Sequence, residues 1–85
     1  MTFTLKQDVT VTETEHGTVL LDQRRSCYFQ LNSTGSLILR ALLDNSSPEH
    51  AASVLTKRYG ISIQQARTDV TKLLSALTTE QLATT

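Results

Sequence analysis

Tryptophan is absent from this 85-residue sequence, and it contains one cysteine and two histidines. A single cysteine excludes a disulfide within the chain, and one cysteine with two histidines is too few for a tetrahedral zinc site. No apolar run approaches the ~20 residues that cross a bilayer, and the N-terminus lacks the basic and then apolar order of a signal peptide. We therefore expect a cytoplasmic protein with no metal, no cofactor and no membrane contact.

An excess of positive charge is also missing. Eight Lys and Arg residues balance eight Asp and Glu residues, so the formal net charge is zero, whereas proteins that bind nucleic acids usually carry a basic excess. The three glycines, at positions 17, 35 and 60, are too scattered to form a phosphate-binding loop. The charge balance counts against nucleic acid as a partner. The length of the chain predicts a single domain over residues 1–85.

The first third of the chain has the pattern of β-strands. Residues 8–14 alternate apolar and polar side chains, which is the period of a half-buried strand. Two further segments, 18–22 and 27–31, follow after His16-Gly17 and after a polar Gln-Arg-Arg-Ser tip. Connections this short predict a three-stranded antiparallel meander over residues 8–32. The first few residues either extend this sheet or stay loose.

Beyond Asn32 the apolar residues recur at helical spacing, which predicts three helices, near residues 34–44, 48–59 and 63–78. Ser47-Pro48-Glu49 is typical of a helix start, Gly60 of a helix end, and Ser62-x-x-Gln65 of a capping box. The final residues, 78–85, are expected to fray. The pattern predicts an α+β fold whose last two helices resemble a helix-turn-helix, with the meander as a wing that precedes the helices.

No group of residues favours catalysis. Cys27 and His16 both lie in the predicted hairpin region, but no helix N-terminus follows Cys27 to activate its thiol. No glycine-flanked elbow presents a serine nucleophile. We interpret Cys27 as an ordinary strand residue and expect no enzymatic activity.

The helix-turn-helix pattern by itself suggests DNA binding, with the helix at 63–78 in the major groove. Its polar face carries Gln64, Gln65, Arg67, Thr68, Thr71 and Lys72. One Arg and one Lys beside Asp69 provide little charge to neutralise phosphates. We favour a solvated polar face, and a winged-helix DNA-binding protein is the alternative.

An uncovered edge strand offers a different function. A three-stranded meander leaves at least one edge free, and an extended peptide can pair with such an edge as an added strand. The aromatic segment 27–31 is a candidate edge, and the helix at 63–78 has more apolar positions than one stripe needs, since Leu73 and Leu74 point ~100° apart. A peptide groove and a wide core stripe both fit this pattern.

Four segments occur in an order and spacing that resemble a known family. They are Gly17-Thr18-Val19-Leu20-Leu21-Asp22, Tyr28-Phe29-Gln30-Leu31-Asn32-Ser33-Thr34-Gly35, Leu37-Ile38-Leu39-x-x-Leu42-Leu43-Asp44 and Ala66-Arg67-Thr68-Asp69-Val70-x-x-Leu73-Leu74-x-x-Leu77. Over residues 8–78 the sequence resembles the PqqD family. The small size and the stretch Gln-Arg-Arg-Ser-Cys-Tyr-Phe-Gln-Leu are most similar to the leader-binding proteins of lasso-peptide biosynthesis.

The resemblance implies a RiPP recognition element, a non-enzymatic domain that captures the leader segment of a ribosomally made precursor peptide. It also implies that the leader pairs as an antiparallel strand with the third strand, before a separate cysteine protease and then a cyclase act on the precursor. In lasso systems such a leader typically carries a Tyr-x-x-Pro element. A peptide chaperone of another pathway is the alternative within the family.

The resemblance further implies which residues form the peptide site. The third strand would contribute its main chain through Arg25, Ser26, Cys27, Tyr28, Phe29, Gln30 and Leu31. The last helix would form the opposite wall with Ala66, Asp69, Val70, Leu73, Leu74 and Leu77. In that wall Asp69 either accepts a hydrogen bond from a leader Tyr hydroxyl or backbone N–H, or forms a surface ion pair with Lys72 or Lys57.

Overall fold

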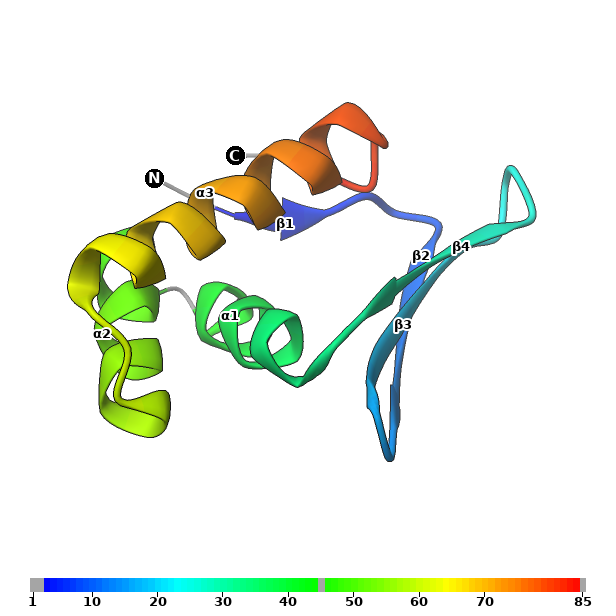
Figure 1. The fold of residues 1–85 in the computed structure, drawn as a ribbon. Helices are drawn as coiled ribbons and strands as arrows, with labels where there is room; N and C mark the ends of the chain where they lie inside the picture. The colour runs from blue at the N-terminus through cyan, green and yellow to red at the C-terminus, as the bar shows by residue number, and fades with distance from the viewer. Residues whose placement is uncertain (1–2, 45, 85) are drawn as a thin grey trace.

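A computed structural model, shown in Figure 1, describes residues 3–44 and 46–84 of the chain. Its elements are β1 (Thr4–Leu5), β2 (Val9–Thr14), β3 (Gly17–Asp22), β4 (Cys27–Leu31), α1 (Ser33–Leu43), α2 (Pro48–Tyr59), α3 (Ile63–Thr79) and β5 (Ala83–Thr84). The predicted α+β fold is confirmed: an antiparallel sheet with the order β2-β3-β4 precedes three helices. Expectations for residues 1, 2, 45 and 85 lie outside the described residues.

Side chains cap the start of each helix. Asn32 follows β4 directly, has an extended backbone, and accepts the N–H of Gly35 at 2.8 Å. The predicted Ser caps of the other two helices are confirmed, since Ser47 accepts the N–H of His50 at 3.0 Å and Ser62 that of Gln65 at 3.1 Å. The capping box predicted at Ser62 is only half formed, because the Gln65 side chain donates to Asp69. These bonds satisfy N–H groups that lack a partner within the helix. Because Asn32 alone separates β4 from α1, the end of the strand is fixed against the start of the helix.

The core lies between the inner face of the sheet and the helices. Leu20 pairs with Phe29 and Thr18 pairs with Leu31 across β3 and β4, so these side chains share the face that packs on α1. The Thr18 and Ser36 hydroxyls are 2.6 Å apart and join that face to α1. The core cluster consists of Phe3, Leu20, Leu31, Ile38, Leu39, Leu42, Ala51, Ala52, Leu55, Ala66, Val70, Leu73, Leu77, Leu82 and Ala83. It includes residues from every helix, so sheet and helices form one hydrophobic unit.

The two ends of the chain form a separate antiparallel ribbon. Leu5 of β1 pairs with Ala83 of β5, and the N–H of Lys6 donates to the carbonyl of Leu82 at 2.8 Å. Phe3, Leu82 and Ala83 are all buried. The expectation that residues 78–85 fray is therefore wrong over its described part, because burial of these apolar side chains holds the tail. The first described residues likewise join the tail instead of extending the meander.

The three helices pack on one another beside the sheet, and α3 lies across the top of α1 in the view of Figure 1. The hairpin of β3 and β4 extends away from α1 toward the end of α3. None of the helices within residues 3–44 and 46–84 has the length and apolar character needed to cross a membrane.

Candidate functional site

The edge strand β4 has one side free. It pairs with β3 on one side, and within the described residues no strand pairs with its other side. A Cβ built on Gly17 would lie 1.9 Å from the carbonyl oxygen of Leu31, so this carbonyl points toward β3. In an antiparallel strand the N–H and C=O groups of one residue point to the same side, and those of the next residue point to the other side. The N–H and C=O groups of Tyr28 and Gln30 therefore face the open edge, and those of Phe29 face β3.

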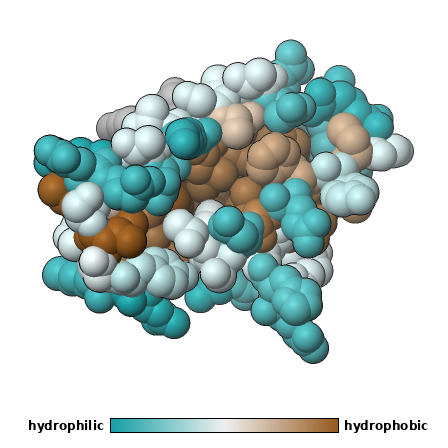
Figure 2. Space-filling model, in the orientation of Figure 1, coloured by the Kyte–Doolittle hydropathy of each residue, from teal (hydrophilic) through white to brown (hydrophobic). Residues whose placement is uncertain are grey.

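A cavity of about 370 Å³ lies where β4 ends. It is lined by Gln30, Leu31, Asn32, Thr34, Gly35, Ile38, Asp69, Lys72 and Leu73, from β4, the start of α1 and the middle of α3. The apolar members Leu31, Ile38 and Leu73 are buried in the core, and polar residues surround them. Figure 2 shows apolar side chains gathered in the middle of this face, with hydrophilic residues around them.

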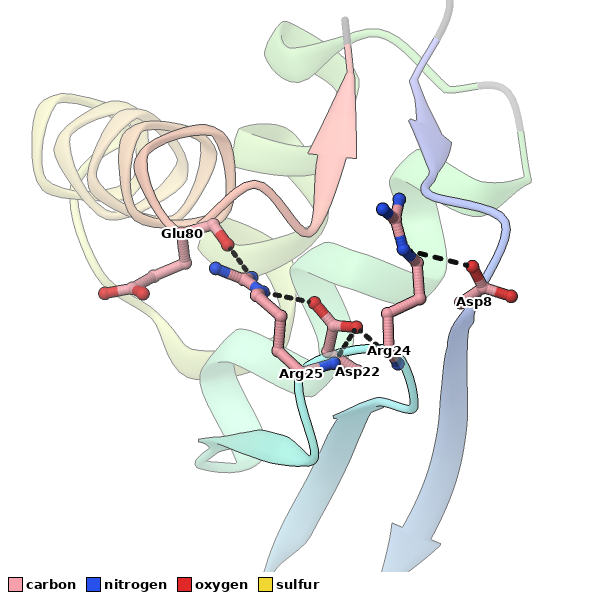
Figure 3. Close-up of polar contacts among 5 residues, drawn as sticks. All are labelled: Asp8, Asp22, Arg24, Arg25 and Glu80. Atoms are coloured by element: carbon pink, nitrogen blue, oxygen red, sulfur yellow. Dashed lines mark hydrogen bonds and ion pairs between the residues drawn. The ribbon is translucent and has the colours of Figure 1, made fainter.

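The cavity is one end of a groove between β4 and the second half of α3. At the other end, the Arg25 side chain just before β4 donates a hydrogen bond to the carbonyl oxygen of Glu80, just after α3 (Figure 3). The end of β4 meets Asp69 and Leu73 in the cavity. The strand and the helix therefore run in opposite directions, and the free edge of β4 faces a groove that α3 borders on its other side.

Five of the six predicted helix residues fall into two sets, and the sixth, Leu74, lies apart from both. Asp69 and Leu73 line the cavity together with Gln30 and Leu31 of β4. Ala66, Val70 and Leu77 are fully buried in the core. Their side chains therefore support the wall from behind, and they are not exposed to the groove.

Leu74 lies on another side of α3. It follows Asp69 by five residues, which corresponds to about 140° around a helix. It also follows Arg67 by two turns, and the guanidinium of Arg67 pairs with Glu49 of α2 at 2.7 Å. The half-buried Leu74 therefore lies on the flank near α2, and the structure does not bring it to the cavity.

Sequence reasoning missed the contribution of α1. Asn32, Thr34, Gly35 and Ile38 line the cavity, and so does Lys72 of α3. The signal for the first three was the Asn-Ser-Thr-Gly junction, since a capping residue directly after an edge strand places the first helical turn beside that strand.

Asp69 is held in place by its own helix. Its Oδ1 accepts a hydrogen bond from Nε2 of Gln65 at 2.9 Å, one turn earlier. The alternative ion pair with Lys72 or Lys57 is not formed among the described residues. A carboxylate has about four acceptor positions, so Asp69 can accept further hydrogen bonds from a ligand in the cavity.

Arg25 and Ser26 lie in the turn before β4, which begins at Cys27. Arg25 donates through Nε to Oδ2 of Asp22 at 2.7 Å (Figure 3). This hydrogen bond and charge lower the pKa of the Asp22 carboxyl below its ordinary value and raise the pKa of Arg25. Within the predicted ladder, the side chain of Arg25 is thus already committed to protein partners.

Two other functions suggested by sequence find little support. His16 lies in the turn before β3, whereas Cys27 pairs with the last residue of β3, so about 17 Å of strand separates them. A catalytic pair of these two residues is excluded by that distance. On α3, Arg67 is engaged by Glu49 and Gln65 by Asp69. These contacts engage the one arginine of α3 and one of its two glutamines, the residue types best suited to reading bases.

Comparison with known proteins agrees with this geometry. The family profile of coenzyme PQQ synthesis protein D (PqqD) matches residues 17–83, and no curated protein matches the sequence. A solved structure of lasso peptide synthetase B1 complexed with the leader peptide superimposes with a TM-score of 0.94 at 36% identity, covering 100% of both chains. A structure of TbiB1 in complex with the TbiA(beta) leader peptide superimposes with a TM-score of 0.85, covering 98% of this chain and 94% of that one, and at 24% identity it shows the fold alone. The chain therefore belongs to the PqqD family and is a PqqD-like RiPP recognition element.

Proposed function

We propose that this domain binds the leader segment of a precursor peptide, of the lasso class, as an antiparallel strand added to β4. The observation that carries the proposal is the free edge of β4 beside α3, with a cavity at one end of the groove that both elements line. The similarity to a lasso peptide synthetase B1 solved with its leader peptide supports the same ligand class. The N–H and C=O groups of Tyr28 and Gln30 provide the hydrogen bonds to the added strand.

The main chain and the side chains of the leader contribute differently to the free energy of binding. A flexible leader loses ~1–2 kcal/mol of backbone entropy per residue on ordering, and main-chain hydrogen bonds return only ~0.5–1.5 kcal/mol each. Apolar leader side chains that enter the cavity add ~25 cal/mol for each Å² buried. Affinity therefore depends on residues that fill the cavity, and the backbone ladder sets the direction and register of the leader.

Asp69 gives the site a polar requirement. Its carboxylate lines the cavity beside the apolar Leu73, so a leader side chain with an apolar body and a donor at its tip fits best. A leader tyrosine has this chemistry, and Asp69 then accepts its hydroxyl hydrogen. A backbone N–H of the leader is the other donor that this carboxylate accepts.

The domain presents the leader and does not cut it. Within the described residues no histidine hydrogen-bonds to Cys27, which is exposed at the start of β4. We infer that a separate cysteine protease removes the leader from the precursor bound here, and that cyclisation follows on another protein. The isolated domain accordingly needs no cofactor to bind its ligand.

A proline scan along β4 tests strand addition. Proline removes a backbone N–H, and it is tolerated in an edge strand where that N–H faces solvent. Gln30→Pro should leave the domain folded and weaken binding of a fluorescent synthetic leader by at least about tenfold in an anisotropy titration, because an outward N–H is lost. Phe29→Pro removes an N–H that faces β3, so it should lower the melting temperature.

Several results would contradict strand addition, leader binding or the choice of ligand. A folded Gln30→Pro domain that binds the leader like the unaltered domain would show that the leader does not pair with β4. Failure of the unaltered domain to bind at micromolar concentration, or hydrolysis of the leader by the purified domain, would refute the proposed function. A shift of duplex DNA in a low-salt gel, without leader binding, would establish the winged-helix alternative.

A further inference from the structure

One side chain joins the hairpin of β3 and β4 to the end of α3. The guanidinium of Arg25 donates through Nε to Asp22, at 2.7 Å, and through Nη2 to the carbonyl oxygen of Glu80 (Figure 3). Asp22 is itself fixed, because its Oδ1 accepts the backbone N–H groups of Arg24 at 3.0 Å and Arg25 at 3.3 Å. It is also one of the few buried polar residues, at 6% exposure. The bridge thus has a rigid base in the hairpin.

Within residues 3–44 and 46–84, this is the only side-chain hydrogen bond from the hairpin to the end of α3. Packing does not replace it there, because a cavity of about 350 Å³ adjoins Arg25, Asp22 and Gln81. The sheet contacts the helices mainly through α1, near the opposite end of β4. The β1–β5 ribbon also ties the sheet to the end of α3, through the chain that leads into β2, but among the described residues Arg25 is the side chain that joins the turn before β4 directly to the turn after α3.

The backbone at both ends of the bridge is constrained. Ser26 has φ 54° and Gln81 has φ 58°, and no other non-glycine residue of the described chain has a positive φ. Ser26 directly follows Arg25, and Gln81 directly follows Glu80. Left-handed backbone is unfavourable for residues with a Cβ, so contacts that hold these two turns must offset the cost. The Arg25 bridge joins these two turns to each other.

We propose that Arg25 is a positioning residue for the leader: by joining Asp22 to the Glu80 carbonyl, it sets the spacing between β4 and α3 at one end of the groove. The inference rests on the proposed function, since the groove is where the leader binds. An added strand needs its neighbour ≈ 4.8 Å away on the β4 side while its side chains contact α3 on the other. If the groove already has this width, no binding free energy is lost in bringing β4 and α3 into place when the leader binds.

The fork of the guanidinium makes the proposal testable. Lysine keeps the charge but has one nitrogen, so it cannot contact Asp22 and the Glu80 carbonyl as the arginine does. Arg25→Lys therefore removes the bridge and retains an ion pair with Asp22, and Arg25→Ala removes both. The neighbouring Arg24 provides a matched control, because its side chain is 80% exposed and its ion pair, at 3.8 Å, is with Asp8.

Hydrogen exchange followed by NMR measures the bridge without any ligand. The N–H groups of Glu80, Gln81 and Leu82 donate to the carbonyls of Ala76, Thr78 and Leu77 at 2.9, 3.0 and 2.9 Å. These three amides should exchange about tenfold faster in Arg25→Ala and Arg25→Lys, because the turn loses its tie to the hairpin. In Arg24→Ala their rates should equal those of the unaltered domain.

Leader affinity is measured on the same proteins by anisotropy. Both Arg25 variants should bind about tenfold more weakly than the unaltered domain, and Arg24→Ala should bind equally well. Full affinity in Arg25→Lys, or unchanged exchange in Arg25→Ala, would overturn the role of the bridge. If the unaltered domain binds no leader, the proposed function fails and so does the positioning role, while the exchange rates still show whether Arg25 holds the hairpin to α3.

Discussion

Gly17 and Leu31 approach so closely across β3 and β4 that a Cβ on the glycine would lie 1.9 Å from the leucine carbonyl oxygen. The φ of Gly17, 145°, is also one that residues with side chains rarely adopt. We therefore expect Gly17→Ala to lower the free energy of unfolding by at least about 2 kcal/mol, measured by urea denaturation. The added methyl group would push Leu31 away and so disrupt the backbone pairing of β3 with β4.

Gly60 is the matched control for this substitution. It ends α2 with φ 70°, and nothing lies within 4 Å of a Cβ built there. Gly60→Ala should lower the free energy of unfolding by only about 1 kcal/mol, because the left-handed backbone is its only unfavourable feature. Equal losses in the two variants would mean that the approach of Gly17 to Leu31 does not constrain the sheet.

The Asp69 carboxylate should matter for binding and little for folding. Asp69→Ala removes a hydrogen-bond acceptor from the cavity, while Gln65, the one side chain among the described residues that bonds to it, stays exposed to solvent. We expect leader binding to weaken by ~1–3 kcal/mol with the melting temperature nearly unchanged. His50→Ala, in the exposed first turn of α2, should change neither quantity. A tight-binding Asp69→Ala domain would place the polar contact elsewhere.

Two adjacent leucines distinguish the groove from the flank of α3. Leu73 lines the cavity, whereas Leu74 lies on the side near α2. Both truncations to alanine should lower the free energy of unfolding, the buried Leu73 by ~2–4 kcal/mol and the half-buried Leu74 by less. In calorimetric titrations corrected for the folded fraction, only Leu73→Ala should lose leader affinity. The reverse order would mean that the leader lies on the α2 side.

The pH dependence of stability follows from Asp22. Its hydrogen bond from Arg25, with backbone N–H bonds from Arg24 and Arg25, lowers the pKa of the folded-state carboxyl below 3.8. A depressed pKa contributes stability above the unfolded-state value, and this contribution is lost as pH falls through the folded-state pKa. Between pH 5 and pH 2, the stability of Asp22→Asn should therefore fall less steeply than that of the unaltered domain. Parallel urea midpoints over this range would contradict the assignment.

The main elements were predictable from the sequence because each has a pattern several residues long. Alternation over β2 and helical spacing over α2 and α3 placed those elements to within about a residue. β1 and β5 were missed, since each spans two residues, which is too short for a period to show. Their pairing joins Leu5 to Ala83 at opposite ends of the chain, and no local pattern indicates such a contact.

Part of the candidate site was also predictable from patterns in the sequence. The resemblance and the apolar stripe indicated Asp69 and Leu73, which the structure brings to the cavity. Leu74 lies on the other border of the same stripe, and both borders look alike in a sequence. The position of α2 shows which border faces the groove, because Arg67, on the Leu74 side of α3, pairs with Glu49 of α2. The Arg25 bridge needs the fold of both turns, and so no pattern around residue 25 indicates it.

Protection of individual amides tests strand addition most directly. The isotopically labelled domain is mixed with the synthetic leader, and exchange of each β4 amide with solvent is followed by NMR. Because the N–H groups of Tyr28 and Gln30 face the open edge and that of Phe29 faces β3, the leader should slow exchange at Tyr28 and Gln30 by at least about tenfold and change Phe29 much less. Leader binding that leaves Tyr28 and Gln30 as exposed as before would contradict the claim that the leader adds to β4.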